Sequence, residues 1–480
     1  MKPKFTFFLV CAAICCLSLN AQSSDDFKVT KLFEASDMNY PSSGWAPTPS
    51  FSANTLRGIA VYGNELYLPV RNSAFGNVVC RLNATTGEFI SVLDTKGTDG
   101  KNMITGGTFV INDIAVSEDG AIYVCNMTSD ARSKKWDKTK EEWVTMSGTV
   151  PFKIYKYASS EAKPEVFLSF DPVEQESTVN TAKTNAFRMG DSFTFKGTSQ
   201  SGKFSTGIDN LRERCYEWTI KDGVLDKNPL VIAFQNDFPE EGSDEYMALD
   251  PKFGGYGRFH FGFEDGTYIE RSKDEGSFLR VFKHDTTSEN FWSYYVMSQG
   301  VQLNATRYGS GNSAYPFEFN NRKYLAMVDF ELPQDNLANA QGVIVDVTNW
   351  SNPVEVFRSP TMGDFYKNGT TGVAVQINEK GFNVYFLSAN GVFGYALESA
   401  KGVGITEAGA QPEVSITVDP VSLKVVFSKF INKVRVYQAQ SGIEVRSASD
   451  IKEIQLLDKG AYILNIVLED GRIVNKCVVL

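Results

Sequence analysis

A short strand-turn-strand unit recurs along the chain, and this recurrence limits the folds that the sequence can adopt. The clearest copy is Ile111–Cys125, in which apolar residues alternate along two strands on either side of an Asp119-Gly120 turn. Alternation with a period of two predicts a strand whose two faces lie in different environments, and Asp-Gly is a strong signal for a tight hairpin. The sequence therefore predicts a chain built from many short antiparallel strands.

These strands group into consecutive units of four. Five such units and a sixth with only three strands follow one another between Gly58 and Glu398, and one further strand, Phe27–Ala35, precedes them. A strand missing from the last unit and a spare strand at the other end are what a closed ring requires. A stacked solenoid, the alternative, needs capping repeats at both ends and leaves no spare strand. We therefore predict an all-β fold in which residues 26–405 form a six-bladed β-propeller closed by the N-terminal strand.

The pattern changes after a Gly- and Ala-rich stretch at residues 401–411. Residues 412–480 contain about seven short alternating strands, joined by tight turns such as Ser441-Gly442 and Asp470-Gly471. This spacing is typical of a small antiparallel β-sandwich. We therefore predict a second domain, a β-sandwich over residues 412–480.

Three stretches of this C-terminal segment resemble the sorting domain of type IX secretion substrates in Bacteroidetes. They are Lys433–Val445, Leu457–Val467 and Arg472–Leu480, and the matching features are Val-Arg-Val-Tyr, Gly-Ala-Tyr-Ile-Leu and a basic-then-aliphatic final strand. This resemblance implies a contact with the secretion machinery, and an accessory sandwich without a sorting role is the alternative. The whole chain also resembles secreted Bacteroidetes propeller proteins that are catalogued only as domains of unknown function, a resemblance that implies no activity.

The N-terminus has the features of an export signal. Lys2 and Lys4 precede a short apolar run, and Ala21 supplies the small residue of a cleavage site. The cysteines of this segment lack the flanking residues of a lipobox, and no later run is long enough to span a bilayer. We therefore predict a signal peptide over residues 1–21 and an extracellular or outer-surface location, with the periplasm as the alternative.

Charge and histidine content argue against several classes of function. The net charge is −10 and no basic stripe is present, so a nucleic-acid partner is not expected. The sequence has two histidines, His260 and His284, and this scarcity argues against a Ser-His-Asp triad and against a multi-His metal site. Neither a calcium-binding loop nor a phosphate-binding Gly loop is found. No cofactor is therefore predicted, and a divalent metal in the channel is kept only as part of an enzyme hypothesis.

The predicted loops differ between the two faces of the ring. Turns between the first and second strands of a unit are short, as at Gly63-Asn64, and define the short-turn face. The second-to-third loops and the connections between units are mostly long, as at Asn126–Pro151 and Gln235–Tyr256, and define the long-loop face. Ordering a long loop costs backbone entropy, and such loops are usually functional. We therefore predict function on the long-loop face, with tolerated insertions as the alternative.

Polar and aromatic residues near this face supply the predicted ligand-binding side chains. Carboxylate, amide and guanidinium groups beside an aromatic platform are typical of sugar recognition. The mixed charges of Lys134–Glu142 predict a solvated loop instead, and Trp136 and Trp143 are either platforms or loop anchors. No catalytic residue and no metal ligand are assigned. The binding candidates are Trp45, Arg71, Asn126, Asp209, Arg258, His260, Arg271 and Asp329.

The function that these features favour is binding rather than catalysis. We predict a secreted or cell-surface propeller that binds a glycan or glycoprotein on the long-loop face. The scarcity of histidine and the absence of catalytic motifs favour this hypothesis. A propeller enzyme acting at the central channel, either a glycoside hydrolase, a lyase or a lactonase, is the first alternative. A protein–protein scaffold is the second.

Overall fold

The computed structural model describes most of the strands that the sequence predicts. The predicted signal peptide, Trp45 and Asp209 lie outside the described residues. No helix within the described ranges is long and apolar enough to cross a membrane. The described residues are 27–36, 55–73, 75–137, 139–173, 187–207, 214–233, 258–264, 266–271, 279–284, 292–296, 314–331, 337–350, 352–362, 364–366, 371–388, 391–400, 416–419, 423–438, 444–456, 458–467 and 473–479.

The chain divides between Gly402 and Val403 into two compact units, which are described separately. The fold is all-β, because every named element is a strand. The described part of the first unit contains six antiparallel sheets of four or five strands, each built mainly from consecutive strands, and one separate two-stranded sheet.

The first three sheets follow the chain in order. The first has β2 (Ala60–Tyr62), β3 (Glu65–Ser73), β4 (Gly76–Asn83) and β5 (Phe89–Val92). The second has β6 (Phe109–Val116), β7 (Ile122–Met127), β10 (Phe152–Tyr157) and β11 (Glu165–Phe170). The third has β12 (Thr194–Gly197), β13 (Ser201–Gly207) and β14 (Arg214–Lys221), which pairs with both β15 (Val224–Leu225) and β16 (Leu230–Ala233).

The next three sheets complete the first unit. The fourth has β17 (Arg258–Phe261), β18 (Thr267–Arg271), β19 (Leu279–His284) and β20 (Trp292–Val296). The fifth has β21 (Ala314–Phe319), β22 (Arg322–Glu331), β23 (Leu337–Asp346), β24 (Val354–Arg358) and β25 (Asp364–Tyr366). The sixth has β26 (Gly372–Asn378), β27 (Gly381–Ser388), β28 (Gly391–Ser399) and the N-terminal strand β1 (Phe27–Ser36).

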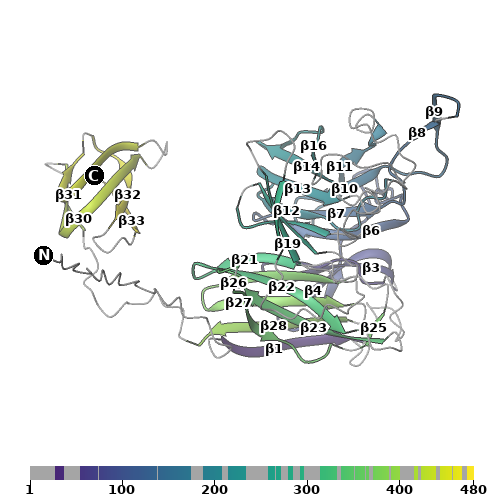
Figure 1. Cartoon of the computed structure of the whole chain (residues 1–480), viewed down its shortest axis with the longest axis horizontal. Helices are drawn as coiled ribbons and strands as arrows, with labels where there is room; N and C mark the ends of the chain where they lie inside the picture. Colours follow the sequence, from purple (N-terminus) through teal and green to yellow (C-terminus); the bar gives the residue numbers. More distant parts are fainter. Residues whose placement is uncertain are drawn as a thin grey trace, which may run out of the picture. The chain divides into compact units, whose positions relative to one another are not determined.

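The predicted pairing of the N-terminal strand with the last sheet is confirmed. β1 runs antiparallel to β28, from Phe27 opposite Ser399 to Ser36 opposite Gly391, although the two strands lie at opposite ends of this unit's sequence (Figure 1). The first strands of the six sheets also form a closed circuit of contacts. In order around the circuit they are β2, β6, β12, β17, β21 and β26, and β26 contacts β2 again. The unit is therefore propeller-like, with its two chain ends joined in one sheet.

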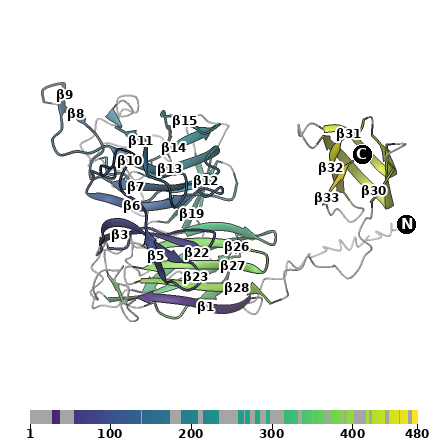
Figure 2. The same ribbon diagram turned by 180° about the vertical axis from the view of Figure 1, so that it is seen from behind.

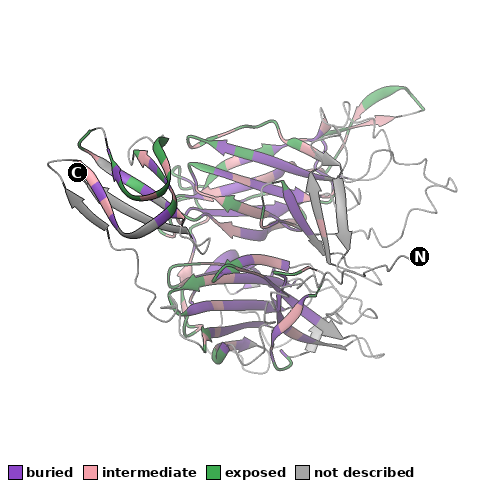
Figure 3. Ribbon diagram, turned by 60° about the vertical axis from the view of Figure 1, so that its left-hand side comes forward, coloured by how far each residue is buried: buried purple, intermediate pink, exposed green. Residues whose placement is uncertain are grey.

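The hydrophobic core lies between neighbouring sheets rather than inside any one of them. Tyr123 and Phe152 of the second sheet pack with Phe204 and Trp218 of the third, and the Phe204 and Trp218 rings are stacked at 5.2 Å. Comparable clusters fill the spaces between other neighbouring sheets, so buried positions run along both faces of the strands (Figure 3). Each sheet therefore depends on a neighbour on both sides.

Two glycines allow the first strands to approach closely at the centre. A Cβ atom on Gly58, just before β2, would collide with the carboxylate of Asp113 on β6. A Cβ on Gly372 would lie 2.8 Å from Cγ2 of Ile59, which is closer than real Cβ atoms come. The absence of side chains at these two positions therefore brings the first, second and sixth sheets together around the axis.

The second unit contains a single antiparallel sheet in its described part. Its long strand β30 (Lys424–Gln438) pairs with β29 (Ile416–Asp419), β31 (Glu444–Gln455) and β32 (Ala461–Val467), and β33 (Ile473–Val479) pairs with β32. Val434, Val436 and Leu464 are fully buried in its own core. The predicted β-sandwich stays a prediction.

One short sheet replaces a predicted loop. Lys134–Glu142 was predicted to be a solvated loop. Lys134 and Glu142 are exposed, but β8 (Lys134–Asp137) and β9 (Glu142–Thr145) form a two-stranded hairpin between β7 and β10. Figures 1 and 2 show it projecting beyond the other strands of the unit. The loop prediction was wrong because it relied on the charge content of the stretch. Charge content does not reveal the cross-strand pairing of Trp136 with Trp143 that holds the two strands together.

We expect removal of β1 to destabilise the whole first unit. A chain starting at Ser52 lacks the strand that covers β28, so β28 becomes an open edge and Phe27 no longer packs on Phe382, 5.3 Å away between ring centroids. Thermal unfolding followed by circular dichroism should show a clearly lower melting temperature than the parent's. An unchanged melting temperature would contradict the importance of this closure.

We also expect the protein to lose stability in alkaline solution. Burial, with the charge of Glu65 as a further cause, raises the pKa of Tyr67 from 10.0 to about 12, and burial raises that of Tyr385 to about 12. Above about pH 10 the unfolded chain loses protons that the folded chain keeps, so the free energy of unfolding falls as pH rises to 12. Denaturant midpoints measured across this range should fall, and less steeply in a Tyr67→Phe/Tyr385→Phe variant.

Candidate ligand-binding site

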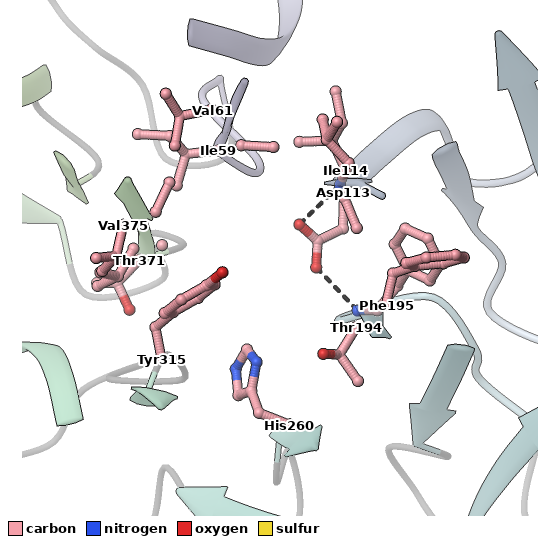
Figure 4. Close-up of a pocket in the computed structure, with 17 residues that line it drawn as sticks. Ile59, Val61, Asp113, Ile114, Thr194, Phe195, His260, Tyr315, Thr371 and Val375 are labelled. Carbon is pink, nitrogen blue, oxygen red and sulfur yellow. Dashed lines mark hydrogen bonds between the residues drawn. The ribbon is translucent and has the colours of Figure 1, made fainter. Parts of the chain in front are cut away.

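The first strands of all six sheets surround a cavity on the axis of the first unit. Its volume is about 90 Å³, and its lining includes Ile59, Asp113, Thr194, His260, Tyr315 and Thr371, one residue from each sheet or the segment just before it (Figure 4). A second cavity of about 320 Å³ shares Thr194, His260 and Tyr315 with the first. The two cavities together are called the channel site below.

The larger cavity lies toward the short-turn face. Its lining includes Glu118, Lys196 and Glu318, which lie at or beyond the ends of first strands, next to the turns into the second strands. All three residues are exposed. The described cavity therefore opens on the face opposite to the predicted long-loop face, and many of the long loops themselves lie outside the described residues.

Asp113 is fixed at the channel wall by main-chain donors. Its Oδ1 accepts a hydrogen bond from the amide of Ile114 at 2.9 Å, and its Oδ2 accepts one from the amide of Phe193, also at 2.9 Å (Figure 4). The second bond comes from the start of the third sheet. The carboxylate therefore ties two neighbouring sheets together at the channel, and its orientation is set before any ligand arrives.

Tyr315 and the channel threonines bring hydroxyl groups to the same space. The ring of Tyr315 reaches into the cavity between His260 and Thr371, and the hydroxyl of Thr194 lies on the opposite wall (Figure 4). Burial, aided by the charge of Glu118, raises the pKa of Tyr315 above its usual value. Its phenol therefore stays protonated at neutral pH and can donate a hydrogen bond.

Arg71 lies at the interface between the first and second sheets. Its guanidinium Cζ is 3.7 Å from the centre of the Phe109 ring, and Cζ of Arg57 is 4.6 Å from the same centre. Burial lowers the pKa of Arg71 from its usual value. Arg71 is half-buried, so part of this predicted residue stays accessible, but it does not line the channel site.

Asn126 and Asp329 are held by structural bonds. Asn126 is fully buried, and its amide donates to the carbonyl of Pro151 at 3.1 Å and accepts from the amide of Lys153 at 2.8 Å. Asp329 is 2% exposed and pairs with Arg358, Oδ2 to Nη1, at 2.9 Å. These bonds account for both residues without a ligand.

Of the predicted candidates in the described part of the chain, His260 lines the channel site. Arg258 and Arg271 are direct register partners on β17 and β18, so the fold brings these two predicted residues side by side. Among the described residues, no three His, Cys, Asp or Glu side chains are grouped as they would be to hold a metal ion.

Sequence reasoning missed most of the channel lining. Thr194 and Tyr315 are ordinary residues for strands and carry no signal of their own. Asn112-Asp113 inside an otherwise apolar strand is the one pattern that could have identified the channel wall. Aspartate is rarely buried unless its carboxylate is paired with another group.

We expect Asp329→Ala to weaken the fold without changing ligand binding. The substitution removes the carboxylate from a hydrogen bond to a charged partner, Arg358, which costs about 1.5–3 kcal/mol. Glu355→Gln is the matched control, since Glu355 bonds the same guanidinium from a more exposed position. Urea unfolding should show a larger decrease in the free energy of unfolding for Asp329→Ala than for Glu355→Gln. Weaker ligand binding by a folded Asp329→Ala variant would contradict this purely structural role.

Comparison with known proteins supports the fold and does not establish a family. No family model and no curated protein matches the chain.

A crystal structure of a DUF4623 family protein from Bacteroides eggerthii has 14% identity and a TM-score of 0.50, covering 77% of this chain and 75% of that one. A gluconolactonase from Xanthomonas campestris has 11% identity and a TM-score of 0.36, covering 72% of this chain and 86% of that one. A glycosyl hydrolase from Bacteroides ovatus has 12% identity and a TM-score of 0.33, covering 75% of this chain and 94% of that one. The first likeness is one of fold alone, and the other two scores are too low to support a shared fold or activity.

Proposed function

We propose that the first unit is a six-bladed β-propeller that binds a saccharide, as part of a glycan or glycoprotein, in its central channel. The observation that carries this proposal is the channel site itself, to which all six sheets contribute residues. Ligand pockets are commonly about 300–1,000 Å³ in volume. The larger cavity, at about 320 Å³, is at the lower end of that range.

The lining chemistry suits a neutral, hydroxyl-rich ligand. Sugar hydroxyl groups both donate and accept hydrogen bonds, and the site offers the hydroxyls of Thr194 and Tyr315 and the imidazole of His260. Phe195 and Tyr315 add aromatic rings to the same lining. A wall that combines fixed polar groups with aromatic surface is what orients a small polar ligand.

The remaining functional expectations belong to this proposal as well. The protein is exported by its N-terminal signal, and the C-terminal unit acts as a sandwich that contacts the secretion machinery. The accessible part of Arg71 and the long-loop face provide further contacts for a larger glycan. No nucleic acid is among the proposed partners.

Two variants that each remove one hydroxyl group test the channel site. Wild type is first screened on a glycan array, and the best binder is then measured by calorimetry against Tyr315→Phe and Thr194→Val. Because a net hydrogen bond contributes about 0.5–1.5 kcal/mol, each variant should bind about 3- to 10-fold more weakly. Tyr62→Phe, on an exposed tyrosine outside the cavity lining, is the control and should bind normally.

The outcome also separates the alternatives. Normal binding by both channel variants together with lost binding by Arg71→Ala would move the site to the long-loop face. Release of shorter sugars during the assay, followed by chromatography, would favour the propeller-enzyme alternative. Absence of any array signal would contradict saccharide binding.

A further inference from the structure

The burial of the first strands changes along the channel. Residues on the long-loop side of these strands are buried, whereas residues at or near the turns into the second strands are exposed. The buried residues are Ile59, Asp113, Phe193, Ala314 and Thr371, and the exposed residues are Tyr62, Glu118, Lys196, Glu318 and Ile377. In the described part of these sheets, the channel is therefore open to water on the short-turn face and covered on the long-loop side.

Close contacts between sheets account for the covered side. Gly58 and Gly372, where a Cβ atom would collide with a neighbouring sheet, both lie on this side, just before β2 and at the start of β26. The side chains of Arg57 and Asn112 are hydrogen-bonded to each other in the same region, and both are buried. These polar groups are therefore used between sheets instead of lining a second opening.

The channel site narrows toward the covered side. The cavity at the mouth has a volume of about 320 Å³, and the inner cavity has about 90 Å³. Because common ligand pockets have about 300–1,000 Å³, the mouth has room for a sugar ring and the inner cavity only for a substituent of that ring. A sugar that enters from the short-turn face therefore stops beside Thr194, His260 and Tyr315, which line both cavities (Figure 4).

A channel with one open end restricts which sugar of a chain can occupy it. An internal sugar carries glycosidic bonds at two positions, so both of its neighbours would have to leave through the same mouth. A terminal sugar carries one such bond, and the rest of the chain can pass out between Glu118, Lys196 and Glu318. In a glycan attached to a protein the reducing end is used for the attachment, so the free end is the non-reducing one.

We propose that the channel site recognises the terminal, non-reducing sugar of a glycan, inserted end-on from the short-turn face. The inference rests on the proposed saccharide-binding function and specifies which part of the glycan is bound. It predicts that a bound glycan is no longer recognised when one further sugar is added to its free end.

The test uses pairs of glycans that differ by one capping sugar. N-glycans ending in N-acetylglucosamine are compared with their galactose-capped forms, and those ending in galactose with their sialic-acid-capped forms. The best binder of the whole array is likewise measured by calorimetry beside the same glycan extended by one sugar at its non-reducing end. The extended glycan should bind wild type at least about 10-fold more weakly, a loss of about 1.4 kcal/mol.

Blocking the mouth tests the direction of entry. Glu318→Cys, at the mouth, is coupled to a polyethylene glycol maleimide, and Glu379→Cys, on an exposed short turn outside the cavity lining, is the matched control. Wild type treated in the same way controls for the native cysteines. The coupled Glu318→Cys variant should bind the best array glycan at least about 10-fold more weakly than the coupled Glu379→Cys variant. Equal binding by the two coupled variants would overturn entry from the short-turn face.

Tyr315→Phe separates this inference from the function on which it rests. Equal wild-type binding of the original and the extended glycan, while Tyr315→Phe still binds both more weakly, would overturn end-on recognition and leave saccharide binding in the channel intact. Unchanged binding by Tyr315→Phe and Thr194→Val would instead overturn the channel site. No binding to any array glycan would overturn both proposals.

Discussion

Burial of sheet faces against neighbouring sheets is the constraint on which the described part of the first unit depends. A sheet that is apolar on both sides cannot end a stack, because its outer face would meet water. The closed circuit of first strands removes this problem, since every sheet then has two neighbours. Phe27 shows how the seam is made: it arrives on β1 and packs against Phe319 of the fifth sheet and Phe382 of the sixth.

The polar groups near the axis serve this packing before they serve a ligand. Arg57, just before β2, donates from Nε to the Asn112 side chain on β6 at 2.6 Å, and Asn112 donates in turn to the carbonyl of Gly190, ahead of the third sheet. Asp113 makes a parallel connection to Phe193. Residues at the first, second and third sheets thus hold the channel wall in place before a ligand binds. This preorganisation lowers the conformational entropy that binding would otherwise cost.

Much of the fold could be predicted from the sequence, because strand alternation and tight turns are local signals. The pairing of Phe27–Ala35 with the last sheet followed from counting strands, and β1 beside β28 confirms it. The site was harder to predict, because a polar residue near a strand end looks the same whether it binds a ligand or holds the backbone. Asn126 holds the main chain around Pro151 and Lys153, and Asp329 holds Arg358. Tyr315 faces the channel only because of where the ring places β21, which no local pattern records.

The seam between β1 and β28 also sets an order of events for the folding chain. During synthesis β1 emerges first, whereas its partner β28 is the last strand of the unit to be made. Until then β1 has no sheet to join, and the apolar faces of the first and sixth sheets have no cover. Contacts of such large sequence separation form slowly and leave an open, loosely ordered state for longer than local pairings do. A ring that closes only with its final strand therefore stays unfinished, with the apolar faces at its seam uncovered, for most of its synthesis.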